Sequence, residues 1–296
     1  MMEGLNLTEQ DTLNTAWRRM ARAFASAGLE TPEVDARFLM QGVMGLDAGA
    51  VLLTPDRPLG DAAGMLNQAV RRRLAQEPVS RILGRRAFYG RDFEITPEVL
   101  DPRPDTETII EAALAVVDRK GWRGQPIRIA DIGTGSGAIL ITLLAELPQA
   151  SGLATDISRE ALEVARRNAV RHGVDARFVT VLTRGLDTIA GPFQLVVSNP
   201  PYIPEAAIAG LAGEVRLFDP LAALDGGPDG LMIYREIACD ISAINEDAVV
   251  VLEVGAGQDD DVVAIFESKA RRGRAETVER RRDLGGHVRC VTLGFV

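Results

Sequence analysis

The first 80 residues carry apolar positions at the spacing of α-helices. Between Thr12 and Ala27, large apolar residues recur three or four positions apart, and Gly28 follows as a helix stop. These apolar residues are Leu13, Trp17, Met20 and Phe24. The spacing predicts an amphipathic helix with one buried face.

A second helix is predicted directly after the first. Thr31 and Pro32 provide an N-cap followed by a proline at the first helical position. Val34, Phe38 and Leu39 continue an apolar stripe, which we expect to be the buried face of this helix.

A third helical pattern runs from Asp61 towards Leu74. None of the residues in these three segments forms a pattern that is typical of catalysis. We therefore expect residues 1–80 to form a small all-helical domain.

After Pro78 the pattern changes to short apolar runs that alternate with helical segments, which is typical of a parallel sheet with crossover helices. The predicted strands are Ile127–Ile132, Gly152–Asp156, Arg177–Leu182, Phe193–Ser198 and Ala248–Val254. The predicted helices between them are Ala138–Leu147, Arg159–Arg171 and Leu231–Ile244. Residues 81–296 are therefore predicted to form a second domain of the α/β class.

Two final strands, Ala275–Arg281 and Val288–Phe295, flank a loop that contains Gly285 and Gly286. They predict an antiparallel hairpin at the edge of an otherwise mostly parallel sheet.

Composition and charge narrow the possible partners. The 296 residues are 46% hydrophobic and 25% charged, as in ordinary globular proteins. Lys and Arg number 33 against 42 Asp and Glu, and the net charge of −9 opposes general attraction to nucleic-acid phosphates. We therefore expect protein or small-molecule partners and no direct sequence-specific nucleic-acid binding.

The location of the protein is predicted from what the sequence lacks. No apolar stretch approaches the roughly 18 residues of a membrane span, and residues 1–5 do not resemble the start of a signal peptide. We expect a cytoplasmic protein without membrane association. Cys239 and Cys290 lie in separate apolar contexts and are interpreted as buried thiols.

The first pattern that suggests chemistry is a glycine-rich loop, DIGTGSG at residues 131–137, between a predicted strand and a predicted helix. Glycines let the backbone turn tightly and approach a ligand, and the amides at the helix start can bind polar groups. Asp156 ends the next strand, 23 positions after Gly133, where a carboxylate can accept both hydroxyl protons of a ribose. The loop also satisfies the looser G-x-G-x-x-A pattern, so it favours a nucleotide-like ligand without identifying it.

The second pattern is Asn199-Pro200-Pro201-Tyr202, which follows directly after a predicted strand. The prolines remove two backbone donors and stiffen the loop, so carbonyl oxygens can point into a site. The Asn199 side-chain oxygen and the Pro200 carbonyl can both accept protons from one planar NH₂ group, and Tyr202 offers a flat face for stacking. This arrangement suits an amide or aromatic amine nitrogen aligned for attack on a sulfonium methyl group.

With these residues the chain resembles the class I methyltransferases that carry an N-P-P-Y motif. Within them it is most similar to the protein-(glutamine-N5) methyltransferases of peptide-chain release factors, known as PrmC or HemK. The resemblance covers nearly the whole chain. Its further blocks are Pro78–Gly84, Phe88–Gly90, Pro102–Glu107, Phe218–Pro220, Ala223-Leu224, Gly226-Gly227, Asp229–Leu231, Asp283-Leu284 and Gly286-His287.

The resemblance implies a Rossmann-like class I methyltransferase sheet preceded by a helical domain that docks the protein substrate. It implies S-adenosyl-L-methionine as cofactor and methyl transfer to a glutamine side-chain amide in the GGQ motif of release factors. The implied cofactor-binding residues are Gly133, Thr134, Gly135, Ser136, Gly137, Asp156 and Asn199. The implied glutamine-binding residues are Asn199, Pro200, Pro201 and Tyr202, of which Asn199, Pro200 and Tyr202 are catalytic. No metal is expected, because a sulfonium methyl group needs no Lewis acid.

Some positions depart from the family pattern or allow two interpretations. Arg184 stands where many members carry an aromatic residue near the adenine, so it is a candidate cofactor contact that could stack on the ring or be solvated. Residues 102–107 fit either a rigid linker that ends in a helix cap at Thr106 or a wall of the cofactor pocket. Glu253 and Asp219 are interpreted as caps rather than catalytic acids.

Other functions remain possible on these residues. A sister enzyme could methylate a glutamine of a ribosomal protein, and adenine-N6 DNA methyltransferases use the same tetrapeptide on a flipped base. The acidic balance and the lack of a large basic insertion disfavour DNA. The intact tetrapeptide disfavours a binding module without catalysis. The lack of a candidate hydride-transfer acid disfavours an NAD-dependent dehydrogenase.

Overall fold

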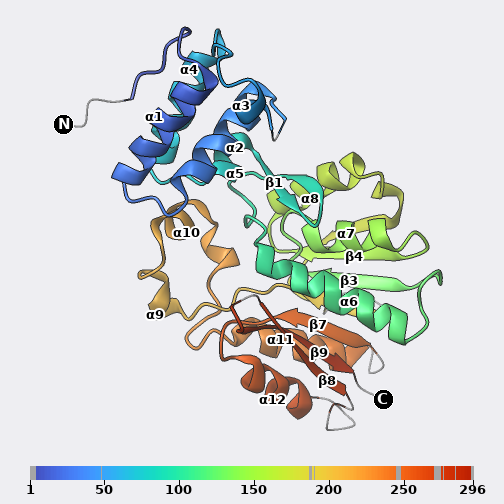
Figure 1. Ribbon diagram of the computed structural model, residues 1–296. Helices are drawn as coiled ribbons and strands as arrows, with labels where there is room; N and C mark the ends of the chain where they lie inside the picture. Colours follow the sequence, from blue (N-terminus) through green and yellow to red (C-terminus); the bar gives the residue numbers. More distant parts are fainter. Residues whose placement is uncertain are drawn as a thin grey trace. The chain divides into compact units, whose positions relative to one another are not determined.

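The computed structural model describes residues 5–47, 49–186, 189, 191–244, 248–269, 275, 277–283 and 285–294, and the chain divides into two compact units (Figure 1). One unit comprises the chain up to Arg85 together with Ala212–Phe218. The other comprises Arg86–Leu211 and Asp219–Val296. Within the described residues, no helix is long and apolar enough to cross a membrane.

The first unit is built of helices around its own apolar core. They are α1 (Leu13–Ser26), α2 (Pro32–Met44), α3 (Ala50–Leu53), α4 (Ala62–Leu74), α5 (Val79–Leu83) and α10 (Gly213–Phe218). Thr12 caps α1 by accepting a hydrogen bond from the Thr15 amide, and Gly28, with φ of 77°, follows its end. The three helices predicted from residues 12–74 are confirmed, whereas α3, α5 and α10 were not foreseen.

The buried face of α2 differs from the predicted stripe. Leu39 is fully buried, but Val34 and Phe38 are 39% and 47% exposed. Ala36 and Met40 occupy the buried positions instead. Val34 and Phe38 lie four positions apart and therefore share a face of the helix that points away from the core. Their assignment to the buried stripe was wrong.

A buried ion cluster ties α10 to the other helices of this unit. The guanidinium group of Arg73, a residue only 3% exposed, donates to Asp35 Oδ2 at 2.8 Å and also pairs with Glu214 of α10. A buried charge is tolerated only when it is paired and hydrogen-bonded. The cluster thus explains why residues 212–218, which come after the tetrapeptide in sequence, belong to the helical unit.

The second unit contains a seven-stranded sheet with the order β5-β4-β3-β6-β7-β9-β8 among the described residues. The strands are β3 (Arg128–Ile132), β4 (Ser151–Asp156), β5 (Phe178–Leu182), β6 (Leu195–Ser198), β7 (Val249–Glu253), β8 (Thr277–Arg282) and β9 (Val288–Gly294). The first five are parallel, and β9 pairs antiparallel with both β7 and β8. A separate two-stranded sheet contains β1 (Arg85–Phe88) and β2 (Arg91–Glu94).

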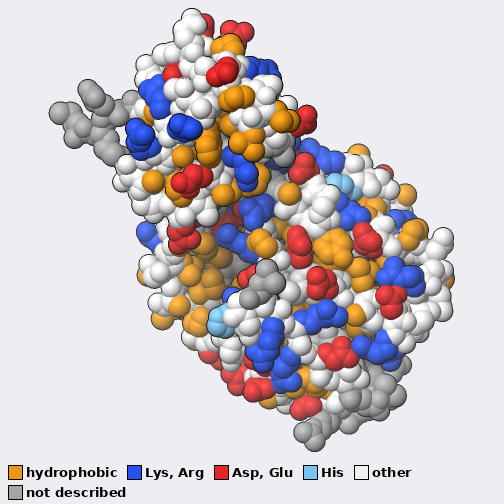
Figure 2. All heavy atoms as spheres, in the orientation of Figure 1, with side chains coloured by type: hydrophobic (Ala, Val, Ile, Leu, Met, Phe, Trp, Pro, Cys, Tyr) orange, Lys and Arg blue, Asp and Glu red, His pale blue; other side chains and the backbone are white. Residues whose placement is uncertain are grey.

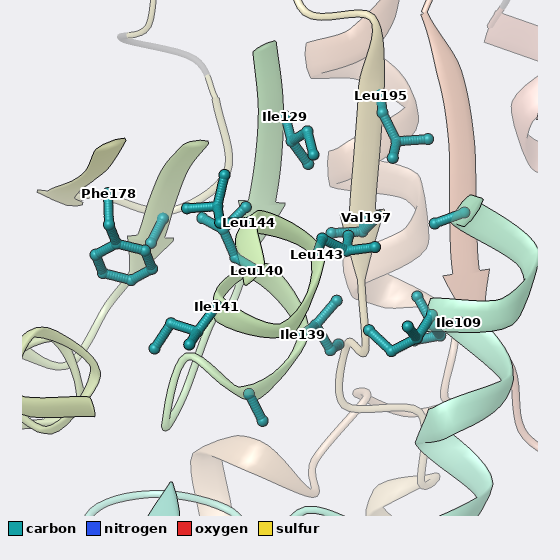
Figure 3. Packing of buried hydrophobic residues seen from close by; sticks show 14 of the residues in the cluster. Ile109, Ile129, Ile139, Leu140, Ile141, Leu143, Leu144, Phe178, Leu195 and Val197 are labelled. Carbon is teal, nitrogen blue, oxygen red and sulfur yellow. The ribbon is translucent and has the colours of Figure 1, made fainter. Parts of the chain in front are cut away.

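Helices cover both faces of the large sheet. The helices α6 (Glu107–Arg119), α7 (Ala138–Glu146) and α8 (Arg159–Arg171) pack on one core, and α11 (Met232–Ile244) and α12 (Asp259–Lys269) pack on the other. Strand residues alternate between the two cores, as Val249 and Val250 do in β7. Figure 3 shows Ile139, Leu140 and Leu143 of α7 among strand side chains such as Ile129.

The remaining short elements connect these layers. They are α9 (Glu205–Ile208), a 3₁₀ turn η1 (Pro104–Thr106), η2 (Asp175–Arg177) and η3 (Leu221–Ala223). The predicted mostly parallel sheet, its crossover helices and its antiparallel C-terminal hairpin are confirmed, with most bounds shifted by one or two residues. Phe295 of the last predicted strand lies outside the described residues.

The two cysteines differ in their surroundings. Cys290 of β9 is buried as expected, and burial raises the pKa of its thiol. Cys239 of α11 is exposed, so its interpretation as a buried thiol was wrong. Its apolar neighbours in sequence misled the prediction, because successive positions of a helix point in different directions.

Candidate active site

Two strands end side by side where the order of the sheet reverses. β3 and β6 pair in parallel with Asp131 opposite Val197, and the Ser198 hydroxyl donates to the Ile132 carbonyl at 2.6 Å. β4 and β5 continue the sheet on one side of β3, whereas β7 continues it beyond β6. Ligands of open α/β sheets bind at the carboxyl ends of strands at such a reversal. The glycine-rich loop and the tetrapeptide both begin there.

The glycine-rich loop needs glycine for two different reasons. Gly133 and Gly135 have φ of 70° and 55°, and a Cβ atom at either would meet no atom within 4 Å. Their positive φ angles disfavour side chains, and the open space leaves their backbone accessible. Gly137 has φ of 82°, but a Cβ atom there would lie 2.6 Å from Ile141 and 3.2 Å from Ala165. Gly137 therefore serves the close packing of α7 and α8.

The polar residues of the loop hold its shape. The Thr134 hydroxyl donates to Asp131 Oδ2 at 2.7 Å, and the Ser136 carbonyl accepts from Asn168 Nδ2 at 2.9 Å. The amides of Gly133 and Thr134 both donate to the Thr155 carbonyl at 2.9 Å. Thr134 and Ser136 are buried, and their described hydrogen bonds are to the protein. Burial raises the pKa of Asp131 to about 7, although its bond from Thr134 opposes the shift.

Asp156 lies at the carboxyl end of β4. Its two carboxylate oxygens accept from the amides of Gly135 and Ser158, each at 2.9 Å. Burial raises the pKa of Asp156, and these amide bonds oppose the shift. An ionised carboxylate has about four acceptor positions, so about two remain for a ligand. Asp156 is therefore held rigidly while keeping capacity to bind hydroxyl groups.

A cavity of about 570 Å³ opens at this edge of the sheet, within the usual size range of small-molecule sites. The predicted site residues that line it are Gly133, Thr134, Gly135, Ser136, Asp156, Arg184, Asn199 and Pro201. The predicted site residues outside its lining are Gly137, Pro200 and Tyr202. Arg184 donates to Glu236 Oε2 at 2.7 Å, and Glu236 also lines the cavity.

Residues 102–107 form part of the cavity wall. Pro102 and Thr106 line the cavity, and Thr106 makes no capping hydrogen bond to α6. Of the two interpretations of this segment, the wall of the pocket agrees with the structure. The Asn199 side-chain nitrogen donates to Thr106 Oγ1 at 3.2 Å.

Tyr202 points towards a buried acid at the end of β7. Its hydroxyl donates to Glu253 Oε1 at 3.4 Å, and its carbonyl accepts from Gln258 Nε2 at 3.1 Å. Glu253 is 2% exposed, and burial raises the pKa of its carboxyl group to about 7. Burial also raises the pKa of the Tyr202 hydroxyl, and the Glu253 charge adds to that shift. The interpretation of Glu253 as a cap does not fit this environment.

A second acid near the site is also buried. The Asp219 side chain is 1% exposed and accepts from Arg103 Nη2 at 2.6 Å. Arg103 precedes Pro104 in the cavity-wall segment, so this ion pair joins two sequence blocks 116 positions apart. Asp219 is thus the ion-pair partner of Arg103.

Sequence reasoning missed Glu236 and Glu253 as neighbours of the site, whereas Thr106 belongs to the segment that was interpreted as a possible pocket wall. Glu253 carried the clearest signal, because it is an acid that directly follows four valine or leucine residues in a predicted strand. An acid at the carboxyl end of a parallel strand lies at the ligand-binding edge. Glu236 gave no such signal, since it comes to the site from α11, far from the glycine-rich loop in sequence.

Comparison with known proteins adds independent information. The family described as PrmC N-terminal domain matches residues 15–84, and the family described as Methyltransferase small domain matches residues 115–216. A release factor glutamine methyltransferase of Rhodospirillum rubrum is 46% identical over 93% of this chain and 81% of its own length. One of Agrobacterium fabrum is 42% identical over 90% of this chain and 92% of its own length.

A solved structure shares the fold at much lower identity. The catalytic domain of hMettl16, in complex with a MAT2A 3'UTR hairpin, matches with a TM-score of 0.55 and 16% identity. The match covers 79% of this chain and 82% of that one. At this identity the likeness concerns the fold alone.

The raised pKa of Glu253 predicts how Glu253→Gln changes stability with pH. Between the ordinary pKa of 4.5 and the folded value of about 7, the unfolded chain loses this proton before the folded protein does. The contribution of the Glu253 carboxyl group to the free energy of unfolding is therefore largest below about pH 4. This contribution falls as pH rises to about 7, by roughly 3 kcal/mol at most. The variant should lack this loss, so its stability relative to wild type should increase between pH 5 and pH 8. Urea unfolding at both pH values measures the difference, and an equal difference at both would contradict the prediction.

Proposed function

The chain belongs to the family of release factor glutamine methyltransferases, and from this premise we propose that it transfers a methyl group from S-adenosyl-L-methionine to a glutamine side-chain amide of a peptide-chain release factor. The observation that carries the proposal is the placement of the tetrapeptide beside the glycine-rich loop. Asn199 and Pro201 line the same cavity as Gly133 and Asp156.

The cavity residues fit S-adenosyl-L-methionine. The open space above Gly133 and Gly135 leaves room for a ligand against the backbone, and Asp156 keeps acceptor capacity for two ribose hydroxyls. Arg184 and Glu236 form an ion pair on the cavity wall, where the guanidinium plane can stack on an adenine ring. The bound cofactor supplies an electrophilic methyl group on a sulfonium.

The tetrapeptide orients the nucleophile. The Asn199 side-chain nitrogen is bonded to Thr106, and its oxygen accepts no hydrogen bond within the described part of the chain. That oxygen and the Pro200 carbonyl accept the two protons of the glutamine NH₂ group. An amide nitrogen is a poor nucleophile, so these acceptors act mainly as positive charge develops during attack. Tyr202 contributes a flat face beside them.

We assign the helical unit to docking of the release factor. Within it, Phe38 of α2 and Leu53 of α3 are 47% and 82% exposed, and hydrophobic side chains lie at its surface among charged ones (Figure 2). Exposed apolar groups of this kind are typical of protein-binding surfaces. Because α10 belongs to the same unit, removal of residues 1–80 would leave α10 without its packing partners, and point substitutions are the better test.

Asp156→Asn should weaken cofactor binding about 10- to 100-fold. The substitution keeps the size of the side chain but removes its charge and replaces an acceptor oxygen by a donor, a loss of roughly 1–3 kcal/mol. Titration calorimetry with S-adenosyl-L-methionine measures it, and Asp175→Asn, at an exposed position, is the matched control. Unchanged affinity in Asp156→Asn would rule out this role.

Asn199→Ala should lower kcat for release-factor methylation by about 10²- to 10³-fold, as for loss of one oxyanion-hole donor. Affinity for the substrate should change less, because the acceptor acts mainly in the transition state. Single-turnover transfer of a tritiated methyl group to purified release factors measures the rate. Ribosomal proteins and DNA tested in parallel separate the alternative substrates. A kcat within a few-fold of wild type would refute the role of Asn199 as an acceptor of the amide protons.

Leu53→Asp should raise KM for an intact release factor about tenfold or more, since a charge in a docked apolar surface is costly. Methylation of a short glutamine peptide should stay unchanged. Val170→Asp, on the exposed face of α8 in the other unit, is the control. Equal loss with the peptide and the protein substrate would show that Leu53 does not act in docking.

A further inference from the structure

The side chain of Gln258 joins the tetrapeptide to the loop that follows β7. Its Nε2 atom donates to the Tyr202 carbonyl at 3.1 Å, and its Oε1 atom accepts from the Gly255 amide at 3.1 Å. Among the described residues, no other donor bonds to the Tyr202 carbonyl. One amide side chain therefore attaches the last residue of the tetrapeptide to the end of the neighbouring strand.

The partners of this amide group fix its orientation. A backbone N–H group can only donate, and a backbone carbonyl oxygen can only accept. The oxygen of Gln258 must therefore face Gly255 and its nitrogen must face Tyr202, because the reversed amide would lose both bonds. The substitution Gln258→Glu keeps the acceptor for Gly255 but places an oxygen against the Tyr202 carbonyl.

Gln258 stands at a helix start, but its side chain does not serve the helix. Its carbonyl accepts from the Val262 amide at 2.9 Å, which makes Gln258 the N-cap residue of α12. The preferred N-cap residues are Ser, Thr, Asp and Asn, whose short side chains bond to amides of the first turn. The Gln258 side chain instead bonds to residues that precede the helix. Stabilisation of α12 therefore does not explain a glutamine at this position.

Two buried glycines leave room for the contact between Gln258 and Tyr202. A Cβ atom at Gly230 would overlap the Tyr202 carbonyl oxygen and would lie 2.7 Å from Gln258 Nε2. A Cβ atom at Gly255 would overlap Gln258 Oε1 and would lie 3.1 Å from Cδ2 of the Tyr202 ring. The backbone thus approaches Tyr202 and Gln258 closely from two loops, one before α11 and one after β7.

The ring end of Tyr202 also meets the end of β7. Its hydroxyl donates to Glu253 Oε1 at 3.4 Å, which is longer than an ordinary O–H···O hydrogen bond. The bond from Gln258 to the Tyr202 carbonyl has an ordinary length for N–H···O. Gln258 therefore provides the better of these two polar attachments of Tyr202.

We propose that Gln258 is a positioning residue for methyl transfer: its hydrogen bond to the Tyr202 carbonyl fixes the backbone of Tyr202 and so holds the Tyr202 ring beside the glutamine amide. This inference rests on the proposed function and adds a residue to its mechanism. Displacement of a positioning group by about 1 Å can cost about 100-fold in rate. Gln258 lies outside the lining of the cofactor cavity, so its role concerns the methyl acceptor and not the cofactor.

The test compares Gln258→Glu, Gln258→Met and wild type in the full-length protein, by the kinetics of release-factor methylation. Both variants should lose about 10- to 100-fold in kcat/KM, with affinity for S-adenosyl-L-methionine within a few-fold of wild type. Gly255→Ala should show the same pattern, because its added methyl group displaces the Gln258 side chain. Gln149→Glu, at an exposed position of the same unit, is the matched control.

A double-mutant cycle separates the positioning of Tyr202 from a general loosening of the fold. If Gln258 acts through the Tyr202 ring, Gln258→Met should cost at most a few-fold in kcat/KM once Tyr202→Ala has removed that ring. Additive losses would overturn the proposal, because they would place the effect of Gln258 elsewhere. Equal losses in cofactor affinity and in kcat/KM would also overturn it.

A second readout does not need the substrate. The chain contains three tyrosines, so NMR of the protein with ring-labelled tyrosine gives few signals, and that of Tyr202 is identified by its absence in Tyr202→Phe. This signal should move in Gln258→Met and Gly255→Ala and stay in place in Gln149→Glu. Wild-type kinetics in both Gln258 variants would overturn the proposal, whether or not the signal moves. If wild type methylates no release factor but the signal moves as described, the proposed substrate is wrong and the positioning of Tyr202 by Gln258 stands.

Discussion

The parallel pairing of β3 with β6 is the constraint on which the site depends. It places the ends of two strands 66 positions apart side by side, with the Ser198 hydroxyl bonded to the Ile132 carbonyl. The glycine-rich loop and the tetrapeptide begin at the next residue of each strand. The order of the sheet reverses at this pair, and a cavity opens there, at the edge where such sheets bind ligands.

Buried and half-buried acids lie along this same edge. Asp131, Asp156 and Glu253 end or nearly end β3, β4 and β7, and burial raises the pKa of each. Their backbone positions are dictated by the parallel sheet, whose strands are covered on both faces. The fold therefore carries an electrostatic cost at the edge of the sheet where the cavity opens. Groups of this kind with shifted pKa values are typical of functional sites.

The chain passes from the sheet unit to the helical unit and back between Leu211 and Asp219. The chain leaves the tetrapeptide, contributes α10 to the helical unit through the Arg73–Glu214 pair, and returns at Asp219, which pairs with Arg103. The ion pairs at the two ends of this segment each contain a buried side chain, Arg73 in the first pair and Asp219 in the second. The segment that follows the tetrapeptide is thereby held at both ends.

The sequence by itself predicted the strands of the large sheet and the helices α1, α2, α4, α7, α8 and α11, because apolar periodicity and glycine positions are local properties that survive in the fold. It also identified Gly133, Asp156 and Asn199 as neighbours, since strand ends of a parallel sheet share one edge. Only the tertiary structure decided which face of α2 is buried, that Cys239 is exposed, and that α10 joins the helical unit. It alone brought Thr106 to Asn199 and Glu253 to Tyr202, because contacts between elements depend on packing across the sheet, which leaves no periodic trace in the chain.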